Sequence, residues 1–308
     1  MGWTNFLWLL LLASLWGPSF LFIKVAVAEI PPFTLVLGRV GMAALMLYIV
    51  LRFRGSRLPK FGVVWRHVAV MAFFSNALPF ILFSWGELYV DSALAAILNG
   101  TTPLFTVVLA HLFVTDDRIT APKLGGILLG FGGLSLLMAP ALVKDGLQAT
   151  TWGLIAISIA AASYGVGMVY ARNHLRGLPP LVAPTAQLGV ATLYMLPLSL
   201  FFERPFSLPL PSWPALASLF SLSFLGTTLA FIIYYHLLEK TSATYLSMVT
   251  YLIPVIGVVL GVAVLNEQLS WNVYLGCALI LVGVMIVNGV FRFITWRRLT
   301  EAPVRSSQ

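Results

Sequence analysis

The chain has 308 residues, of which 60% are apolar and only 9% are charged, and its formal net charge is +8. Soluble globular chains carry about 25% charged residues, so this composition excludes a soluble protein. Ten membrane spans of about 21 residues each would occupy roughly 210 residues. The residues that remain are too few for a nucleotide-hydrolysing domain or a DNA-binding domain.

Apolar stretches long enough to cross a bilayer recur along the chain, separated by proline, glycine and charged residues. Backbone groups in lipid must hydrogen-bond internally, so stretches of this length predict helices, not the shorter alternating strands of a barrel. The first stretch lacks the basic segment of a cleaved signal peptide and is expected to be retained. The expected all-α membrane helices cover residues 4–28, 33–53, 65–87, 93–114, 123–140, 151–172, 181–202, 213–237, 243–264 and 271–293.

Lysine and arginine are distributed unevenly over the predicted loops. If the N-terminus is cytoplasmic, fourteen of these residues lie in inside segments and two, Lys144 and Arg204, lie in outside loops. Lys24 and Arg39 fall within helices. Because cytoplasmic loops are enriched in positive charge, the distribution predicts that both termini are cytoplasmic.

The two halves of the sequence resemble each other. Pro31-Pro32 recurs 148 residues later as Pro179-Pro180, and Pro103 recurs 151 residues later as Pro254. The Gly125-Gly126 doublet leaves the alignment of the last helices ambiguous by one residue. Further matches at these offsets are Trp16 with Tyr164, Gly17 with Gly165, Lys24 with Arg172, Phe80 with Phe231, Gly125 with Gly276 and Gly132 with Gly283.

Each half holds five predicted helices, and an odd number gives the two halves opposite orientations in the membrane. The sequence therefore predicts two inverted five-helix repeats, residues 1–145 and 146–293, around a central cavity. A basic cytoplasmic tail, residues 294–308, follows them. Secondary transporters use inverted repeats and bind their substrate near the middle of the membrane.

These motifs resemble those of EamA-type members of the drug/metabolite transporter superfamily, from Leu7 to Gly289. The resemblance implies ten helices, cytoplasmic termini, a central cavity and export of small metabolites, and it extends to the branch that exports aromatic amino acids. Asp116-Asp117 and Asp91 depart from the family pattern. The segments that carry the resemblance are Ala13–Gly17, Arg39, Thr241–Ala243, Pro254, Glu267–Ser270 and Gly276–Gly283.

Polar and aromatic residues in the predicted membrane interior are the candidates for substrate binding. Trp16 and Tyr164 form an aromatic pair from equivalent positions, while Asn76, Phe80 and Phe83 share one helix face. The alternative to substrate binding is that these residues only pack the helices together. For Asn76 the alternative is a hydrogen bond between helices. The candidate binding residues are Trp16, Asn76, Phe80, Phe83, Asn99, Tyr164, Tyr234, His236, Met248 and Tyr251.

Prolines and glycines within the helices are candidate hinges, because Pro18 removes a backbone hydrogen bond and Gly17 permits close approach. Arg39 has two interpretations: it pairs with an acid or with helix-end carbonyls, or it acts as a gate or a carboxylate anchor. Thr101 and Thr102 either line the cavity or satisfy carbonyls that a proline frees. The candidate hinges or gates are Gly17, Pro18, Arg39, Pro79, Pro103 and Pro254.

Most titratable residues lie near the predicted helix ends, whereas Arg39 lies about two turns into its helix. Lys24 can reach the headgroups, and Glu87 lies near the outer end of its helix, so no carboxylate is expected at mid-membrane. Facilitated export or exchange is therefore favoured over proton coupling. The four histidines are far apart in sequence and Cys277 is alone, so we expect no metal, no cofactor and no catalytic residue.

Taken together, these features predict a secondary transporter in the inner membrane that exports small metabolites by alternating access. Amino acids, including aromatic ones, are the leading substrates because aromatic residues dominate the candidate binding set. Purines or cationic drugs are the alternative substrates, and a channel or receptor is the alternative class. The expected partners are the substrate and the lipid bilayer, not nucleic acid, and the sequence does not determine the oligomeric state.

Overall fold

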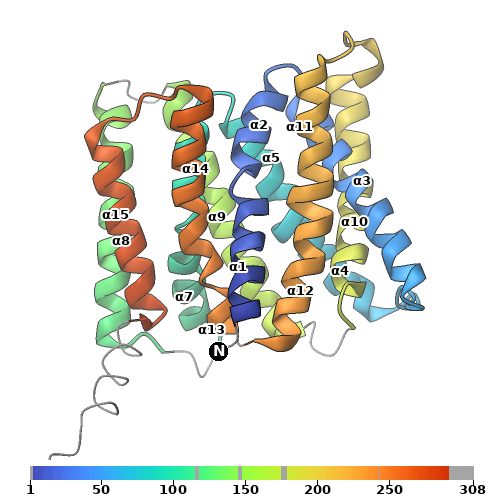
Figure 1. The fold of residues 1–308 in the computed structure, drawn as a ribbon, viewed down its shortest axis with the longest axis horizontal. Coiled ribbons are helices and arrows are strands. Elements are labelled where there is room, and N and C mark those ends of the chain that lie inside the picture. The colour runs from blue at the N-terminus through green and yellow to red at the C-terminus, as the bar shows by residue number, and fades with distance from the viewer. Residues whose placement is uncertain (1–2, 115–117, 145–147, 175–178, 242, 291–308) are drawn as a thin grey trace, which may run out of the picture.

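A computed structural model describes residues 3–114, 118–144, 148–174, 179–241 and 243–290. Helices make up 83% of the structure, and the described residues contain no strand. The helices run along a common direction, and the N-terminal residues lie at one end of the bundle (Figure 1). We call this end the N-terminal end and the opposite one the far end.

Eight helical segments are long and apolar enough to cross a membrane, and two further apolar helices are shorter. The eight are Trp3–Val27, Pro32–Phe53, Val63–Gly86, Ser92–Phe113, Ala121–Val143, Ala149–Arg172, Val182–Glu203 and Trp213–Lys240. The two shorter helices are α14 (Val249–Leu265) and α15 (Trp271–Val287). All ten predicted membrane stretches are thus helical, although residues 291–293 of the last one lie outside the described residues.

Several segments consist of more than one helix, because glycine or proline interrupts them. The first contains α1 (Trp3–Trp16) and α2 (Ser19–Val27), separated at Gly17-Pro18. The fourth contains α6 (Ser92–Asn99) and α7 (Thr102–Phe113), with Pro103 in the first turn of α7. A short helix, α13 (Ala243–Leu246), precedes α14.

The third and eighth segments each contain a π-helical insertion. In the third, η1 (Phe73–Ala77) joins α4 (Val63–Ala72) to α5 (Leu78–Gly86). In the eighth, η4 (Phe224–Leu229) joins α11 (Trp213–Ser223) to α12 (Ala230–Lys240). Periodicity in the sequence gave no sign of these insertions, which widen the helix and change the direction of the side chains.

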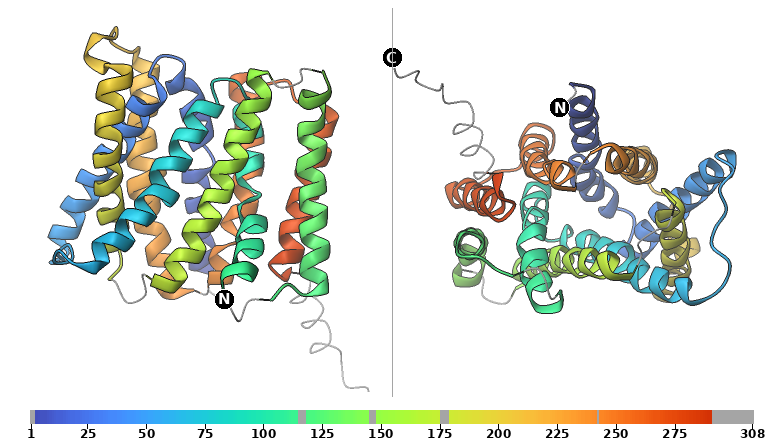
Figure 2. Two further views of the ribbon diagram at one scale, coloured as in Figure 1. Left: turned by 180° about the vertical axis from the view of Figure 1, so that it is seen from behind. Right: turned by 90° about the horizontal axis from the view of Figure 1, so that it is seen from below.

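The remaining helices are α3 (Pro32–Phe53), α8 (Ala121–Lys144), α9 (Ala149–His174) and α10 (Val182–Leu198), which continues into η2 (Ser199–Glu203) and a short turn, η3 (Pro205–Ser207). Seen from below, α8 and α15 form a pair at one edge of the bundle (Figure 2). The other helices pack around the central part, where α9 contacts both α5 and α7 and α3 contacts α10.

Glycines let α8 and α15 approach closely. A Cβ added at Gly126 would lie 2.7 Å from the carbonyl oxygen of Gly283, and one added at Gly133 would lie 2.7 Å from that of Gly276. Gly125 and Gly132 have nothing within 4 Å of such a Cβ. In the Gly125-Gly126 doublet, which left the alignment ambiguous, and in Gly132-Gly133, the second glycine therefore makes the contact with α15.

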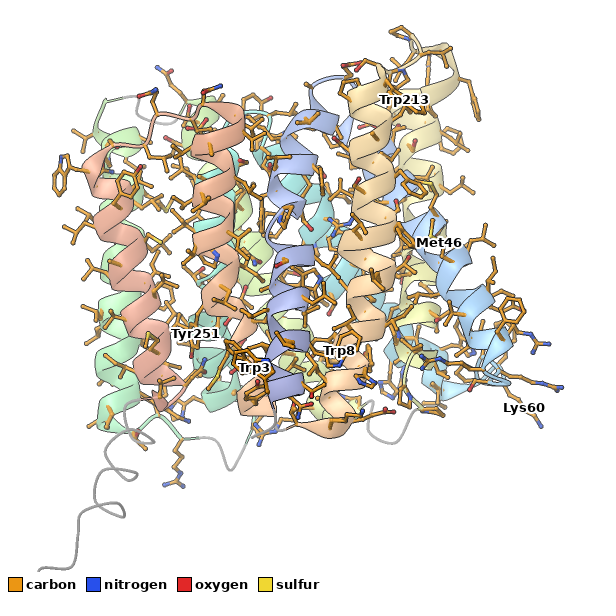
Figure 3. The ribbon with its side chains drawn as sticks, in the orientation of Figure 1. Trp3, Trp8, Met46, Lys60, Trp213 and Tyr251 are labelled. Atoms are coloured by element: carbon orange, nitrogen blue, oxygen red, sulfur yellow. The ribbon has the colours of Figure 1, made fainter. Side chains whose placement is uncertain are left out.

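The outer surface carries large apolar side chains, as expected for contact with lipid. Trp3, Trp8 and Lys60 lie toward the N-terminal end, and Trp213 lies at the far end (Figure 3). Trp3 and Trp213 are exposed, which suits an aromatic belt at each membrane interface.

Candidate functional site

The π-helical insertion η1 places Asn76 inside the bundle. Pro79 lies in the first turn of α5, two residues after the insertion, and its missing amide favours a change of hydrogen-bonding pattern at this point. The carbonyl of Phe74 is bonded by the Ser163 hydroxyl of α9 at 2.7 Å. Asn76 is 1% exposed and its amide donates to the side-chain oxygen of Gln187 on α10 at 3.4 Å. The sequence left open whether Asn76 lines a cavity or links helices, and here it links α10 to the third segment.

The second insertion, η4, places Thr227 inside the bundle in the same manner. The hydroxyls of Thr227 and Thr228 donate to carbonyls five residues earlier, those of Leu222 and Ser223, at 2.8 and 2.9 Å. These hydroxyls therefore satisfy carbonyls that the π-helical geometry leaves free. The Thr227 hydroxyl also accepts a hydrogen bond from the Nε of Arg39 at 3.1 Å.

Arg39 is buried between α3, α5 and η4, with 7% of its surface exposed. Its guanidinium carbon lies 3.8 Å from the centroid of the Phe80 ring, a cation–π contact. The hydrogen bond of Arg39 is therefore not made to an acid or a helix-end carbonyl, although the Glu87 carboxyl is near enough to interact with its charge. A threonine hydroxyl and an aromatic face hold the side chain instead.

A chain of aromatic rings continues from Phe80 along α5. Phe83, one turn later, stacks on Tyr164 of α9 with centroids 6.1 Å apart and meets Phe20 of α2 edge-on at 5.5 Å. Phe80 and Phe83 are buried, and Tyr164 is half-buried. Tyr164 is also near enough to Arg39 to interact with its charge. These side chains form a group that we call the arginine–aromatic cluster: Arg39, Phe80, Phe83 and Tyr164.

A second aromatic group lies between α1 and α12. The Trp16 ring is 5.6 Å from that of Tyr234, and the Trp8 ring is 5.4 Å from that of His236. Trp16 does not contact Tyr164 through its ring; each belongs to a separate aromatic pair. Because His236 packs against Trp8 near the N-terminal end, it is not part of the arginine–aromatic cluster.

The fourth and ninth segments place their candidates mainly in packing roles. The hydroxyls of Thr101 and Thr102 donate to the carbonyls of Leu98 and Asn99 at 2.6 and 2.8 Å, which favours the alternative in which they satisfy freed carbonyls. The Tyr251 hydroxyl accepts from the amide of Asn288 at 2.7 Å.

The other candidates in these two segments contact the core of the bundle. Met248 packs with the residues between α1 and α12, and Pro254 lies inside α14. Gly100 and Pro254 meet where α6 crosses α14, since a Cβ at Gly100 would lie 2.9 Å from the proline ring.

At the far end, Lys24 and Glu87 have unexpected environments. The Lys24 ammonium donates to the carbonyl oxygens of Glu87 and Val90 at 2.7 and 2.8 Å. It therefore binds backbone carbonyls just beyond α5, whereas the sequence predicted that it would reach the headgroups. The Glu87 carboxyl is fully buried, and neither of its oxygens has a hydrogen bond. Lys24, Arg39 and Glu267 are near enough to interact with its charge. The sequence placed Glu87 near a helix end and did not indicate its burial.

Three glutamates at the far end each bind the N-terminal amides of a different helix, which sequence reasoning missed. Glu203 accepts from the backbone of Phe33 and Thr34, and Glu267 accepts from Ser92 and Ala93. The hydroxyl and amide of Ser212 both donate to Glu29, and these bonds lower the pKa of its carboxyl. Carboxylates favour helix N-termini because the amides there are unpaired and the helix dipole is positive.

Histidines meet at the N-terminal end, although they are far apart in sequence. The rings of His67 and His174 stack at 4.9 Å, and His67 is hydrogen-bonded to the Tyr170 hydroxyl at 2.8 Å. Over the described residues, no group of three or more histidine, cysteine, aspartate or glutamate side chains could hold a metal ion.

The helices and their apolar surface are those of an all-helical, multi-pass membrane protein. The sequence matches the EamA-like transporter family over residues 3–139 and again over residues 151–289, and the chain belongs to this family.

Proteins similar to this chain in sequence are named as transporters. The uncharacterized transporter YoaV of Bacillus subtilis is 24% identical over 279 residues, 90% of this chain and 94% of YoaV. The uncharacterized inner membrane transporter YedA of Escherichia coli K12 is 26% identical over 277 residues, 89% of this chain and 87% of YedA. A crystal structure with 19% identity aligns with a TM-score of 0.66 over 96% of this chain and 99% of that one, which supports the fold.

Proposed function

We propose that this protein is a secondary transporter that exports amino acids, aromatic ones among them, across the inner membrane by alternating access. The observation that carries the proposal is the arginine–aromatic cluster, in which a buried cation lies beside Phe80 and the stacked pair Phe83 and Tyr164. A cation suits a carboxylate, and aromatic faces suit an apolar or aromatic side chain.

The architecture in this proposal is two inverted five-helix repeats around a central site, with both termini in the cytoplasm. Two hydrogen bonds support it. Arg39 and Gln187 are 148 residues apart, their partners Thr227 and Asn76 are 151 residues apart, and these are the offsets of the sequence repeat. The insertions η1 and η4 begin 151 residues apart, and the family matches the two halves separately.

Export of cationic compounds is the second candidate, and Glu87 is the observation that favours it. A buried carboxyl without a hydrogen-bond partner could receive a cation. Lys24 and Arg39 oppose this, because both interact with the charge of Glu87 and would repel a second cation nearby. Amino acids therefore remain the preferred substrates.

The test is uptake by liposomes that contain the purified protein, with labelled phenylalanine, tryptophan, small amino acids, nucleobases and cationic dyes. We expect saturable uptake of the aromatic amino acids and none in liposomes without protein. If the liposomes take up nucleobases or dyes but no amino acid, the proposed substrate class is refuted. Uptake of the cationic dyes would support export of cationic compounds, the second candidate.

A further inference from the structure

The two hydrogen bonds that connect the halves are equivalent in position but not in charge. The uncharged amide of Gln187 on α10 accepts a hydrogen bond from Asn76 of η1. The charged guanidinium of Arg39 on α3 donates one to Thr227 of η4. Gln187 is 8% exposed and Arg39 is 7% exposed, so both are similarly buried. An uncharged side chain is therefore sufficient to link the helices at this position.

The charge of Arg39 carries a cost that this linking role does not explain. Charged side chains in the membrane interior are costly and commonly serve a function. Only Nε is hydrogen-bonded and Phe80 covers one face of the guanidinium, while Tyr164 and the Glu87 carboxyl are near enough to interact with its charge but are not bonded to it. The two terminal amines have no hydrogen-bond partner among the described residues, so four N–H donors remain.

We propose that the terminal amines of Arg39 bind the carboxylate of the transported amino acid. The inference rests on the proposed function and assigns a substrate group to one residue of that site. Thr227 and Phe80 hold the guanidinium plane in place, and a planar fork with two parallel donors matches a carboxylate. Tyr164, which is half-buried and stacks on the buried Phe83, provides an aromatic surface for the substrate side chain close to this anchor.

Phenylalanine and phenylalaninamide test the assignment, because they share the ammonium group and the ring and differ only at the carboxylate. Each compound would compete with labelled phenylalanine for uptake into liposomes at equal internal and external pH. Arg39→Gln reproduces the residue at the equivalent position of the other half. Arg39→Lys keeps the charge but loses the fork, and Gln187→Ala breaks the equivalent helix link without altering the guanidinium.

A charge-assisted carboxylate contact should make phenylalanine about tenfold to a hundredfold weaker as a competitor in Arg39→Gln. Phenylalaninamide should change by less than about threefold, so the preference for the carboxylate largely disappears. Arg39→Lys should keep part of the preference. Gln187→Ala should change both compounds by the same factor. All rates are normalised to the amount of folded protein.

An equal loss for both compounds in Arg39→Gln would overturn the assignment and leave Arg39 as a packing residue. If Arg39→Gln does not fold, Arg39→Lys decides the question, since an unchanged preference there also overturns the assignment. If the unmodified protein takes up nucleobases or dyes and no amino acid, the proposed function itself fails. That outcome is distinct from one in which phenylalanine is transported and Arg39 does not affect the preference.

Discussion

The crossing of α8 and α15 allows a stability test in which two adjacent glycines serve as test and control. A Cβ at Gly133 would lie 2.7 Å from the Gly276 carbonyl oxygen and 2.8 Å from the Cβ of Leu279, whereas one at Gly132 would have nothing within 4 Å. Because a backbone oxygen cannot rotate away, Gly133→Ala must push the helices apart. Overpacking of this kind costs about 1–3 kcal/mol.

Alanine also has a higher helix propensity than glycine, by about 0.8–1.0 kcal/mol. Gly132 and Gly133 are adjacent in the same helix, so this gain cancels when the two variants are compared. The difference between Gly133→Ala and Gly132→Ala should therefore equal the overpacking cost, about 1–3 kcal/mol. At about 2–4 °C per kcal/mol, Gly133→Ala should melt roughly 2–12 °C lower than Gly132→Ala.

The assay is thermal unfolding of both variants in the same detergent, followed by loss of monodisperse protein. Gly126→Ala and Gly125→Ala repeat the comparison at the other end of the crossing, where only Gly126 faces a backbone oxygen. Equal melting temperatures within both pairs would refute the close backbone contact and, with it, the choice of the second glycine in each doublet.

Three further predictions concern transport and topology. Cysteine at Pro209 should react with an impermeant thiol reagent outside cells and cysteine at Gly55 should not, since the charge distribution places Gly55 inside; the opposite labelling would reverse the proposed orientation. Because the acids of the described helices lie at their ends, uptake should proceed down a substrate gradient at equal pH, and strict dependence on a proton gradient would contradict this. Trp16→Ala and Tyr164→Ala should each lower the rate for aromatic over small substrates by roughly two- to tenfold, whereas Trp271→Ala, an exposed control, should leave that ratio unchanged.

The sequence was sufficient for the helices because a membrane imposes length and hydrophobicity on every span. Each predicted stretch is helical, and the predicted bend at Gly17-Pro18 is the boundary between α1 and α2. Sequence periodicity did not predict η1 and η4, because it assumes 3.6 residues per turn throughout. A π-helical turn leaves the apolar composition of the segment unchanged, so composition carries no sign of it.

The candidate site was harder to predict, because the role of a polar residue in a membrane depends on which side chains contact it in the folded protein. Arg39 was among the candidates from the sequence, yet its partner Thr227 is 188 residues away in sequence and was not among them. Glu87 lies one residue beyond α5 and looked like an interfacial acid. Its burial depends on the packing of neighbouring helices, which local sequence does not report.

The differences between the two halves indicate where the site is specific. A transporter with two equivalent halves would offer its substrate the same groups from both sides, but an amino acid has a carboxylate at one point and a side chain at another. The structure departs from equivalence in two places that suit such a ligand: Arg39 corresponds to Gln187, and the break between α1 and α2 corresponds to an unbroken α9. Hydrogen bonds at equivalent positions connect the halves, although Arg39 donates to Thr227 and Gln187 accepts from Asn76. The equivalent helix link through Gln187 needs no charge and the equivalent helix α9 needs no break, so a role in binding the substrate would explain both the charge of Arg39 and the break at Gly17-Pro18.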